Sequence, residues 1–304
     1  MARILRYIDL TYKELSQLPR DKTLLFSVVG PLEVHGPHLP LGTDVMIALE
    51  AMKRVEERLA EEKPGLTIVE LPPIVLGSDP LPLPGSIEIS SKHLSGVLYD
   101  TASSLARQGF RALILFDNHG GPRHQLAIYK ASRKAWKKHR FCLLDPFITL
   151  FKMMVKHHPR LMELAGLPPG RCGDDPDMHA GTNETSLMLA SHPDKVRPLY
   201  RELKPSRIPP HRGSAKLILH IAGLLDKLGL KEAASDLAHL ANTLAWVNTK
   251  PITPYLGSPA QATVEAGEKM LKAAIQLTLE MIGQVLEGEC PLDKPLLNFL
   301  SFLA

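Results

Sequence analysis

The chain has 304 residues, of which 44% are hydrophobic and 22% are charged, and its formal net charge is +4. These proportions are typical of a globular protein with a full hydrophobic core. Basic residues are scattered along the chain and aromatic residues make up only 5% of it. The composition therefore argues against a nucleic-acid-binding surface, which needs a basic stripe and aromatic stacking partners.

We expect a cytoplasmic protein with no membrane partner. The stretch MARILRYIDLTYKEL at the N-terminus has no apolar core followed by a small-residue cleavage site, and no segment approaches the length of a membrane span. The cysteines Cys142, Cys172 and Cys290 are odd in number and far apart. They predict neither a disulfide framework nor a zinc finger, and we interpret them as thiols in a reducing compartment.

Strands and helices alternate in the first half of the chain. Apolar runs predict strands at residues 24–29, 67–76, 111–116 and 141–144. Helical spacing of apolar residues predicts helices at 12–18, 44–62, 91–108 and 125–139. Thr43 or Asp44 is expected to cap the second of these helices. Such alternation predicts an α/β fold with a mostly parallel sheet covered by helices on both faces.

The second half of the chain is expected to contain further helices. Residues 150–210 are less regular, residues 216–248 predict two helices separated by Gly229, and residues 264–286 predict one long amphipathic helix. We expect a single domain over residues 1–304. The stretch at about 206–248 is interpreted as a helical insertion that serves as either a lid or an oligomer contact.

A group of polar side chains directly follows the first apolar run, in the segment GPLEVHGPHLPLGTD at residues 30–44. Glu33 and His35 are two residues apart, so an extended backbone would place both side chains on one face. Asp44 opens the next helix and can return a carboxylate to the same place. Two carboxylates and an imidazole at a strand end suggest a divalent metal site, and the alternative is a solvated polar loop.

Two further polar clusters lie downstream. The run at 111–116 ends in DNHGG, which contains Asn118 and His119, and residues 179–186 are HAGTNETS. Ligands of parallel sheets bind beyond the carboxyl ends of the strands, which places His119 near Glu33 and His35. Glu184 lies where a helix begins, and taken alone it is better explained as a capping carboxylate.

Taken together, these clusters resemble the creatininase family of metal-dependent amidohydrolases. The matching motifs are E-x-H followed by LPLGTD, the strand ending in NHGG, and HAGTNETSLML; the turn at 84–86 and the run GSPAQATVEAGEKML are also similar. The resemblance covers roughly residues 27–286. It implies a three-layer α/β/α sandwich with a mostly parallel central sheet, a two-metal site beyond that sheet, and a homo-oligomer between a dimer and a hexamer.

The resemblance also implies a set of metal ligands. Glu33, Asp44 and His119 would hold one ion, and His35 and Asp44 would hold the second, with Asp44 bridging. Creatininase itself has a metal-binding Glu at the position of Gly121. In the NHGG variant, Glu184 or a water molecule is expected to complete the second ion's ligands. The expected cofactors are two divalent ions, and this mixture of ligands suits Zn, Mn or Fe(II).

The remaining site residues follow from the same resemblance. His179 matches the His that lies beside the substrate and can move a proton, so His179 and Glu184 are the expected catalytic residues. Ser86, Gly120, Asp177 and His179 are the expected substrate-binding residues. The implied reaction is cleavage of the C–N amide bond of a small cyclic amide or formamide through a metal-bridging hydroxide, which is a nucleophile at neutral pH because the cations lower the pKa of water.

The sequence leaves several substrate classes open. The expected gating loop, roughly 166–178, contains Asp174, Asp175 and Asp177 but none of the tryptophans of creatininase, which disfavours creatinine. Trp136 and Trp246 are interpreted as packing residues of helices. The family also includes formamide-cleaving enzymes of flavin and deazaflavin biosynthesis and a peptide-trimming enzyme of mycofactocin maturation. The alternatives are a peptide or lactone hydrolase on the same scaffold and a non-catalytic relative that binds a metal or small ligand.

Overall fold

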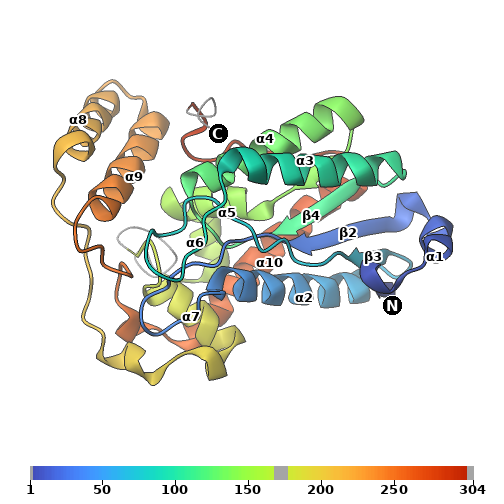
Figure 1. Ribbon diagram of the computed structural model, residues 1–304, viewed down its shortest axis with the longest axis horizontal. Helices are drawn as coiled ribbons and strands as arrows, with labels where there is room; N and C mark the ends of the chain where they lie inside the picture. The colour runs from blue at the N-terminus through green and yellow to red at the C-terminus, as the bar shows by residue number, and fades with distance from the viewer. Residues whose placement is uncertain (1–2, 168–176, 300–304) are drawn as a thin grey trace.

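The computed structural model of the protein describes residues 3–167 and 177–299 (Figure 1). Within these residues five strands form one sheet: β1 (Arg3–Arg6), β2 (Thr23–Val28), β3 (Thr67–Glu70), β4 (Ala112–Phe116) and β5 (Cys142–Leu144). Their order is β1-β3-β2-β4-β5 and each pairing of neighbours is parallel. The four predicted strands are confirmed. Strand β1, whose sequence RILR has no apolar run, is an addition to them.

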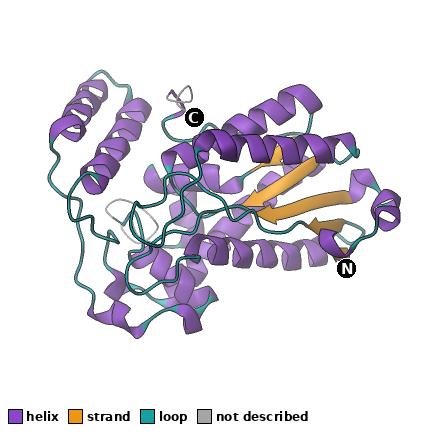
Figure 2. Cartoon of the chain, in the orientation of Figure 1, coloured by secondary structure: helices purple, strands orange, loops and turns teal. Residues whose placement is uncertain are grey.

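Four helices cover the two faces of this sheet, as Figures 1 and 2 show: α2 (Thr43–Glu62), α3 (Ser91–Arg107), α4 (Pro122–His139) and α10 (Val264–Leu286). Alternate side chains of each strand point to opposite faces. Leu25 of β2 packs with α3 and α4, whereas Leu24 and Phe26 pack with α2 and α10. The three-layer α/β/α arrangement follows from strands that are apolar on both faces.

The connections between strands create a crevice at one edge of the sheet. The chain runs from β2 through α2 to β3 on one side, and then from β3 through α3 to β4 on the other side of β2. Because parallel crossovers are right-handed, this reversal of direction places α2 and α3 on opposite faces. Ligands of open α/β sheets bind at such a reversal, beyond the carboxyl ends of the strands. The segments that follow β2 and β4 therefore meet there.

Six further α-helices of the described residues lie outside the sheet layers. Helix α1 (Tyr12–Gln17) is at the amino-terminal side of the strands (Figure 1). The other five lie around the carboxyl ends: α5 (Pro146–Val155), α6 (Pro159–Ala165), α7 (Thr182–Ser191), α8 (Gly213–Lys227) and α9 (Lys231–Val247). The two helices expected at 216–248 are confirmed, and Gly229 with a φ of 77° joins them. They form a hairpin at the left of Figure 1. The expectation that residues 150–210 are less regular is wrong for the parts of this range that form α5 and α6. Both start at a proline, preceded by the capping side chains of Asp145 and His158.

The start of α2 differs from the predicted capping. Its N-cap is Gly42, with no capping side chain. The Thr43 hydroxyl donates instead to the carbonyl of Pro40 at 2.7 Å. Asp44 is buried within the first turn. Its carboxylate is therefore available to neighbours in the crevice and is not consumed in capping the helix.

The interpretation of all three cysteines as unpaired thiols is also wrong. Cys142 of β5 forms a disulfide with Cys290, 148 residues later, with their Cα atoms 5.5 Å apart. Sequence spacing cannot reveal such a pair, because α10 must first return along the sheet to bring Cys290 beside β5. Cys172 lies outside the described residues. Among the helices described, none has the length and apolar character needed to cross a membrane.

A close helix crossing provides a test of this packing. Gly267 of α10 approaches α7 so closely that an added Cβ would lie 2.6 Å from the Ser186 carbonyl carbon and 2.8 Å from the Ala190 Cβ. We predict that Gly267→Ala lowers the free energy of unfolding by about 1–3 kcal/mol through overpacking. The matched control is Gly283→Ala on the same helix, where nothing lies within 4 Å and a gain of up to ~1 kcal/mol is expected. The free energies of unfolding would be measured by urea titration. Equal changes in the two variants would contradict this packing.

Candidate metal centre

The segment that leaves β2 carries Glu33 and His35 into the crevice, and hydrogen bonds on both sides fix it there. The Glu33 amide donates to the Leu41 carbonyl at 2.8 Å, and the Val34 amide donates to the Ser86 hydroxyl at 3.0 Å. Glu33 and His35 are both buried. Ser86 thus supports the backbone of this segment and is not among the residues that line the cavity described below. Its expected contact with substrate finds no support in this geometry.

The loop after β4 positions His119. One carboxylate oxygen of Asp117 accepts the amide hydrogens of Asn118 and His119, at 2.8 and 2.9 Å. The Nε2 of His119 donates to the Ser78 carbonyl at 2.9 Å. In the neutral imidazole this leaves Nδ1 without a proton, pointing at Glu33 Oε2 at 3.0 Å. A backbone carbonyl that fixes the tautomer in this way is characteristic of metal-binding histidines.

His35 is oriented in a similar manner. Its Nδ1 donates to the Glu33 carbonyl at 3.0 Å. Its Nε2 then faces Asp44 Oδ1 at 3.4 Å and Glu184 Oε2 at 3.7 Å. In their neutral forms both histidines therefore direct an unprotonated ring nitrogen toward the same group of carboxylates.

The buried charges of this cluster perturb one another strongly. Burial opposes protonation of His35, but the carboxylates of Asp44 and Glu184 outweigh it and raise the pKa of His35 to about 10. The pKa of His119 is raised well above its usual value against the same burial effect, by Glu33 and Asp44. Although burial acts in the opposite direction, His35 and His119 hold the pKa of Asp44 well below its usual range. The site is thus an anionic pocket that needs cations, whether protons or metal ions.

Three facing ligand atoms have unused hydrogen-bonding capacity. Glu33 Oε2, His35 Nε2 and Asp44 Oδ2 are buried and make no hydrogen bond to any described residue. Leaving buried polar atoms unpaired costs about 1–3 kcal/mol each, so such atoms call for an explanation. Three sets of ligand atoms lie within 4.8 Å of one another, and one of them is Glu33, His35 and His179. The other two are Glu33, Asp44 and His119, and His35, Asp44 and Glu184. The residues present therefore fit divalent ions, with Asp44 common to the latter two sets.

Glu184 comes from the first turn of α7 and joins the cluster in two ways. Its Oε2 accepts the amide hydrogen of Ala180, and its Oε1 accepts from the Asn118 side chain at 3.2 Å. The Asn118 amide also points at Asp44 Oδ1, at 3.4 Å. Glu184 therefore binds the backbone just before the N-cap Gly181 and does not cap the helix itself, and it also faces His35.

His179 lies beside the cluster and against Trp246, which is predicted to be a packing residue. Its Nε2 donates to the Val34 carbonyl at 2.7 Å, and its Nδ1 lies 4.0 Å from Glu184 Oε2. The ring of Trp246, from α9, is centred 5.4 Å from the His179 ring and lines the same cavity. Trp246 packs as predicted, in a buried cluster with Leu81, Ile252 and Leu256, and in addition it lines this cavity. No sequence signal could have placed it here, because the hairpin must first fold back over the site.

The other expected substrate-binding residues also line this cavity. Gly120 lines the cavity in close contact with Phe151. A Cβ added to Gly120 would lie 2.7 Å from the Phe151 ring. Asp177 is buried and accepts two hydrogen bonds from Asn183, at 3.0 Å from its amide and 2.7 Å from its side chain. Burial and the nearby Glu184 raise the pKa of Asp177 to about 7. Asp174 and Asp175 lie outside the described residues.

Gly121 occupies the position at which creatininase has a metal-binding Glu. A Cβ added at Gly121 would overlap His119 Nε2 and lie 2.8 Å from the Ser78 carbonyl oxygen. These two groups form the hydrogen bond that orients His119. A side chain at this position is therefore incompatible with the observed arrangement of the loop. Asp44 and Glu184 are the carboxylates that face His35 Nε2.

The sequence of this chain matches a known protein family. The family model named Creatininase, described as creatinine amidohydrolase, matches residues 8–282. The chain belongs to the creatininase family of hydrolases. It is 31% identical over 193 residues to creatinine amidohydrolase of Pseudomonas putida, covering 62% of this chain and 72% of that one. It is 26% identical over 284 residues, 90% of each chain, to the mycofactocin precursor peptide peptidase of Mycobacterium ulcerans strain Agy99.

Solved structures share this fold. A creatinine amidohydrolase structure superposes with a TM-score of 0.63 and 23% identity over 93% of this chain and 98% of that one. Two other creatininase structures, both 22% identical, are described as an Mn form and a Zn–Zn type. Their TM-scores are 0.61 and 0.60, and they cover 93% and 94% of this chain and 99% of their own. The predicted α/β architecture and the resemblance to the family are thus confirmed.

The crowding at Gly121 leads to a prediction. Gly121→Ala should displace His119 from its bond to Ser78 and weaken metal binding by about 10- to 100-fold, the usual effect of losing a group that orients a ligand. Competition with a chelator, followed by elemental analysis, measures the affinity. The control is Gly96→Ala, on the exposed side of α3 with nothing within 4 Å. Equal metal affinity in the two variants would contradict the role given to the Ser78–His119 contact.

Proposed function

We propose that this protein is a binuclear metal-dependent amidohydrolase that cleaves a C–N amide bond. The observation that carries the proposal is a convergence of buried ligand atoms. Glu33 Oε2, His35 Nε2 and Asp44 Oδ2 make no hydrogen bond to any described residue, and His119 Nδ1 faces both Glu33 and Asp44. The membership of the chain in the creatininase family supports it.

The ligands divide into two sets that share one residue. Glu33, Asp44 and His119 would hold one ion and His35, Asp44 and Glu184 the other, so that Asp44 would be shared by both. The distances support this division, since Asp44 Oδ1 faces His35 and Asp44 Oδ2 faces His119. Mixed carboxylate and imidazole ligands suit Zn, Mn or Fe(II), and the Mn and Zn–Zn forms of structural neighbours are consistent with that choice.

When bound, two divalent ions would supply a Lewis acid for the amide carbonyl and an activated water at neutral pH. The role we give His179 is movement of a proton. The Val34 carbonyl holds its Nε2 hydrogen, which leaves Nδ1 facing the site to take a proton and deliver it to the leaving nitrogen. Glu184, which faces Nδ1, would stabilise the resulting imidazolium. Gly120 and Asp177 would contact the substrate from the cavity wall.

The proposal allows two classes of amide substrate, and a non-catalytic role is disfavoured. A small cyclic amide or formamide is the first. A peptide is the second, and the match to a peptide peptidase over 90% of both chains favours it. All the expected ligands are present and close together, whereas a non-catalytic relative would have no need to keep the complete set. Lactone hydrolysis is a further alternative on the same residues.

Three expectations accompany this proposal. We expect a homo-oligomer, and exposed apolar residues of the hairpin such as Leu217 and Leu224 are suited to a contact between copies. A cytoplasmic location is also expected, although the Cys142–Cys290 disulfide is unusual in a reducing compartment. We treat the chain as one domain, in which residues 206–248 are an insertion.

The proton-transfer role predicts the effect of one substitution. His179→Ala should retain the bound metal and lower kcat by about 100-fold or more, because the leaving nitrogen loses its proton donor. Metal-loaded protein would be assayed on a panel of creatinine, formamides and short peptides. His139→Ala, which removes an exposed histidine bonded to Tyr99, is the control. Normal turnover by the His179 variant would exclude this residue from the mechanism.

A further inference from the structure

The cavity beside the cluster, about 630 Å³ in volume, has two unlike parts. Polar groups gather at the end next to the cluster, where Glu33, His119, His179 and Glu184 all contribute to the wall. The rest of the wall is mostly apolar. Its charged members, Asp79, Glu88 and Arg123, pair with one another, and Thr243, Thr278 and His239 add a few polar atoms. The catalytic end and the apolar part are continuous, so a molecule bound at the cluster can extend into the apolar part.

The apolar part follows two helices for several turns. On α2 it is lined by Ile47, Ala51 and Val55, and on α10 by residues that include Met270, Ala274 and Thr278. Residues four apart lie on the same face of a helix, so each set forms one continuous stripe. Eight residues separate the ends of each stripe, which corresponds to a length of about 12 Å. The cavity is therefore an elongated channel that leads away from Asp44 along α2.

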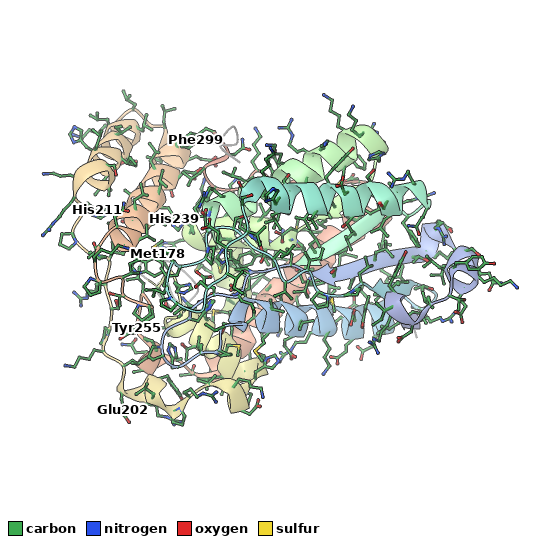
Figure 3. All side chains as sticks on the ribbon, viewed as in Figure 1. Met178, Glu202, His211, His239, Tyr255 and Phe299 are labelled. Atoms are coloured by element: carbon green, nitrogen blue, oxygen red, sulfur yellow. A yellow bond between two sulfur atoms is a disulfide. The ribbon has the colours of Figure 1, made fainter. Side chains whose placement is uncertain are left out.

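Helices α5 and α9 close the channel from the other sides. Phe147, Phe151 and Met154 line it from α5, and Thr243 and Leu244 line it from α9. His239, which Figure 3 labels on α9, lies with its ring centred 5.7 Å from that of Phe151, so the hairpin and α5 meet across the channel. Trp246 adds the wall nearest to His179. The hairpin thus forms part of the binding site.

An apolar channel of this size needs an explanation in energetic terms. Apolar cavities are poor sites for water, which finds no hydrogen-bonding partners there. Each empty volume in a core also lowers stability in proportion to its size. A channel that is apolar, elongated and open to a polar reaction site is the expected shape for a ligand with a polar head and an aliphatic chain.

We propose that the amide substrate of this protein carries an aliphatic chain, and that this chain occupies the channel between α2, α5, α9 and α10. The inference rests on the proposed amidohydrolase function for the position of the amide. A chain of roughly eight to ten carbons matches the length of about 12 Å spanned by the two stripes. The polar end of the cavity holds the amide beside Glu33, His119 and Glu184, and the aliphatic lining selects the chain.

Straight-chain primary alcohols test the channel without any reaction at the cluster. We would titrate the full-length, metal-loaded protein with the series from 1-butanol to 1-dodecanol by calorimetry. Affinity should rise about fourfold for each methylene that is buried and level off near ten carbons. An affinity that does not change with chain length would overturn the proposal. This experiment uses only the wild-type protein.

One variant pair then locates the binding. Ala274→Phe would fill the channel and should weaken decanol binding by at least tenfold while leaving butanol binding unchanged. Lys272→Phe adds the same ring to the exposed side of α10 and should leave the whole series unchanged. If Ala274→Phe does not fold, Ala51→Leu partly fills the channel from α2. Equal decanol binding in a folded channel variant and in Lys272→Phe would overturn the proposal.

Turnover of amides is a separate readout. N-methyl alkanamides of four to twelve carbons should be hydrolysed by the metal-loaded protein with kcat/KM rising toward the longer chains. Hydrolysis with no preference for chain length would overturn the channel proposal. Chain-dependent alcohol binding without hydrolysis of any amide would support the channel and overturn the proposed reaction, so the two failures are distinguishable.

Discussion

The Asp44 carboxylate is a buried negative charge shared between two histidines, and the rest of the site is arranged around it. One oxygen faces His35 at 3.4 Å and the other faces His119 at 3.5 Å. A buried charge is very costly unless cations or hydrogen bonds compensate it. Because Glu33 and Glu184 add further negative charge, the two imidazoles are held in orientations that offer ring nitrogens to the same small volume. Divalent ions between these groups would satisfy the charges that protons otherwise balance.

The fold supplies this arrangement through the reversal of direction at β2. The segments after β2 and β4 meet because those strands are neighbours in the sheet, and α2 starts close enough to return Asp44 to the same place. The groups that orient the histidines are backbone carbonyls of Glu33 and Ser78, so they depend on chain path and not on side-chain identity. A scaffold of this kind can hold the reaction site constant while α9 and the lining of the channel change the substrate.

Much of this could be predicted from sequence because the relevant signals are local. Strands β2 and β4 are continuous apolar runs, and Glu33, His35 and His119 directly follow them, so the topology of parallel sheets alone places these residues together. Other features depend on contacts between distant segments. The Cys142–Cys290 pair, the contact of Trp246 with His179 and the support of Val34 by Ser86 link parts of the chain whose proximity no spacing or periodicity encodes. The capping of α2 cannot be predicted for a different reason. Asp44 is a residue type that favours helix capping, but its side chain faces His35 and His119 instead.

Metal content per chain, measured by elemental analysis, tests the central claim most directly. Wild-type protein loaded with Zn, Mn or Fe(II) should bind close to two ions per chain. Glu184→Gln should lose the ion held with His35 and retain the other, and Asp44→Asn should lose both, while Glu57→Gln on the exposed side of α2 should match the wild type. Wild-type protein that binds no metal after reconstitution, or an Asp44 variant with two ions, would contradict the assignment of Asp44 as the bridge of a binuclear site.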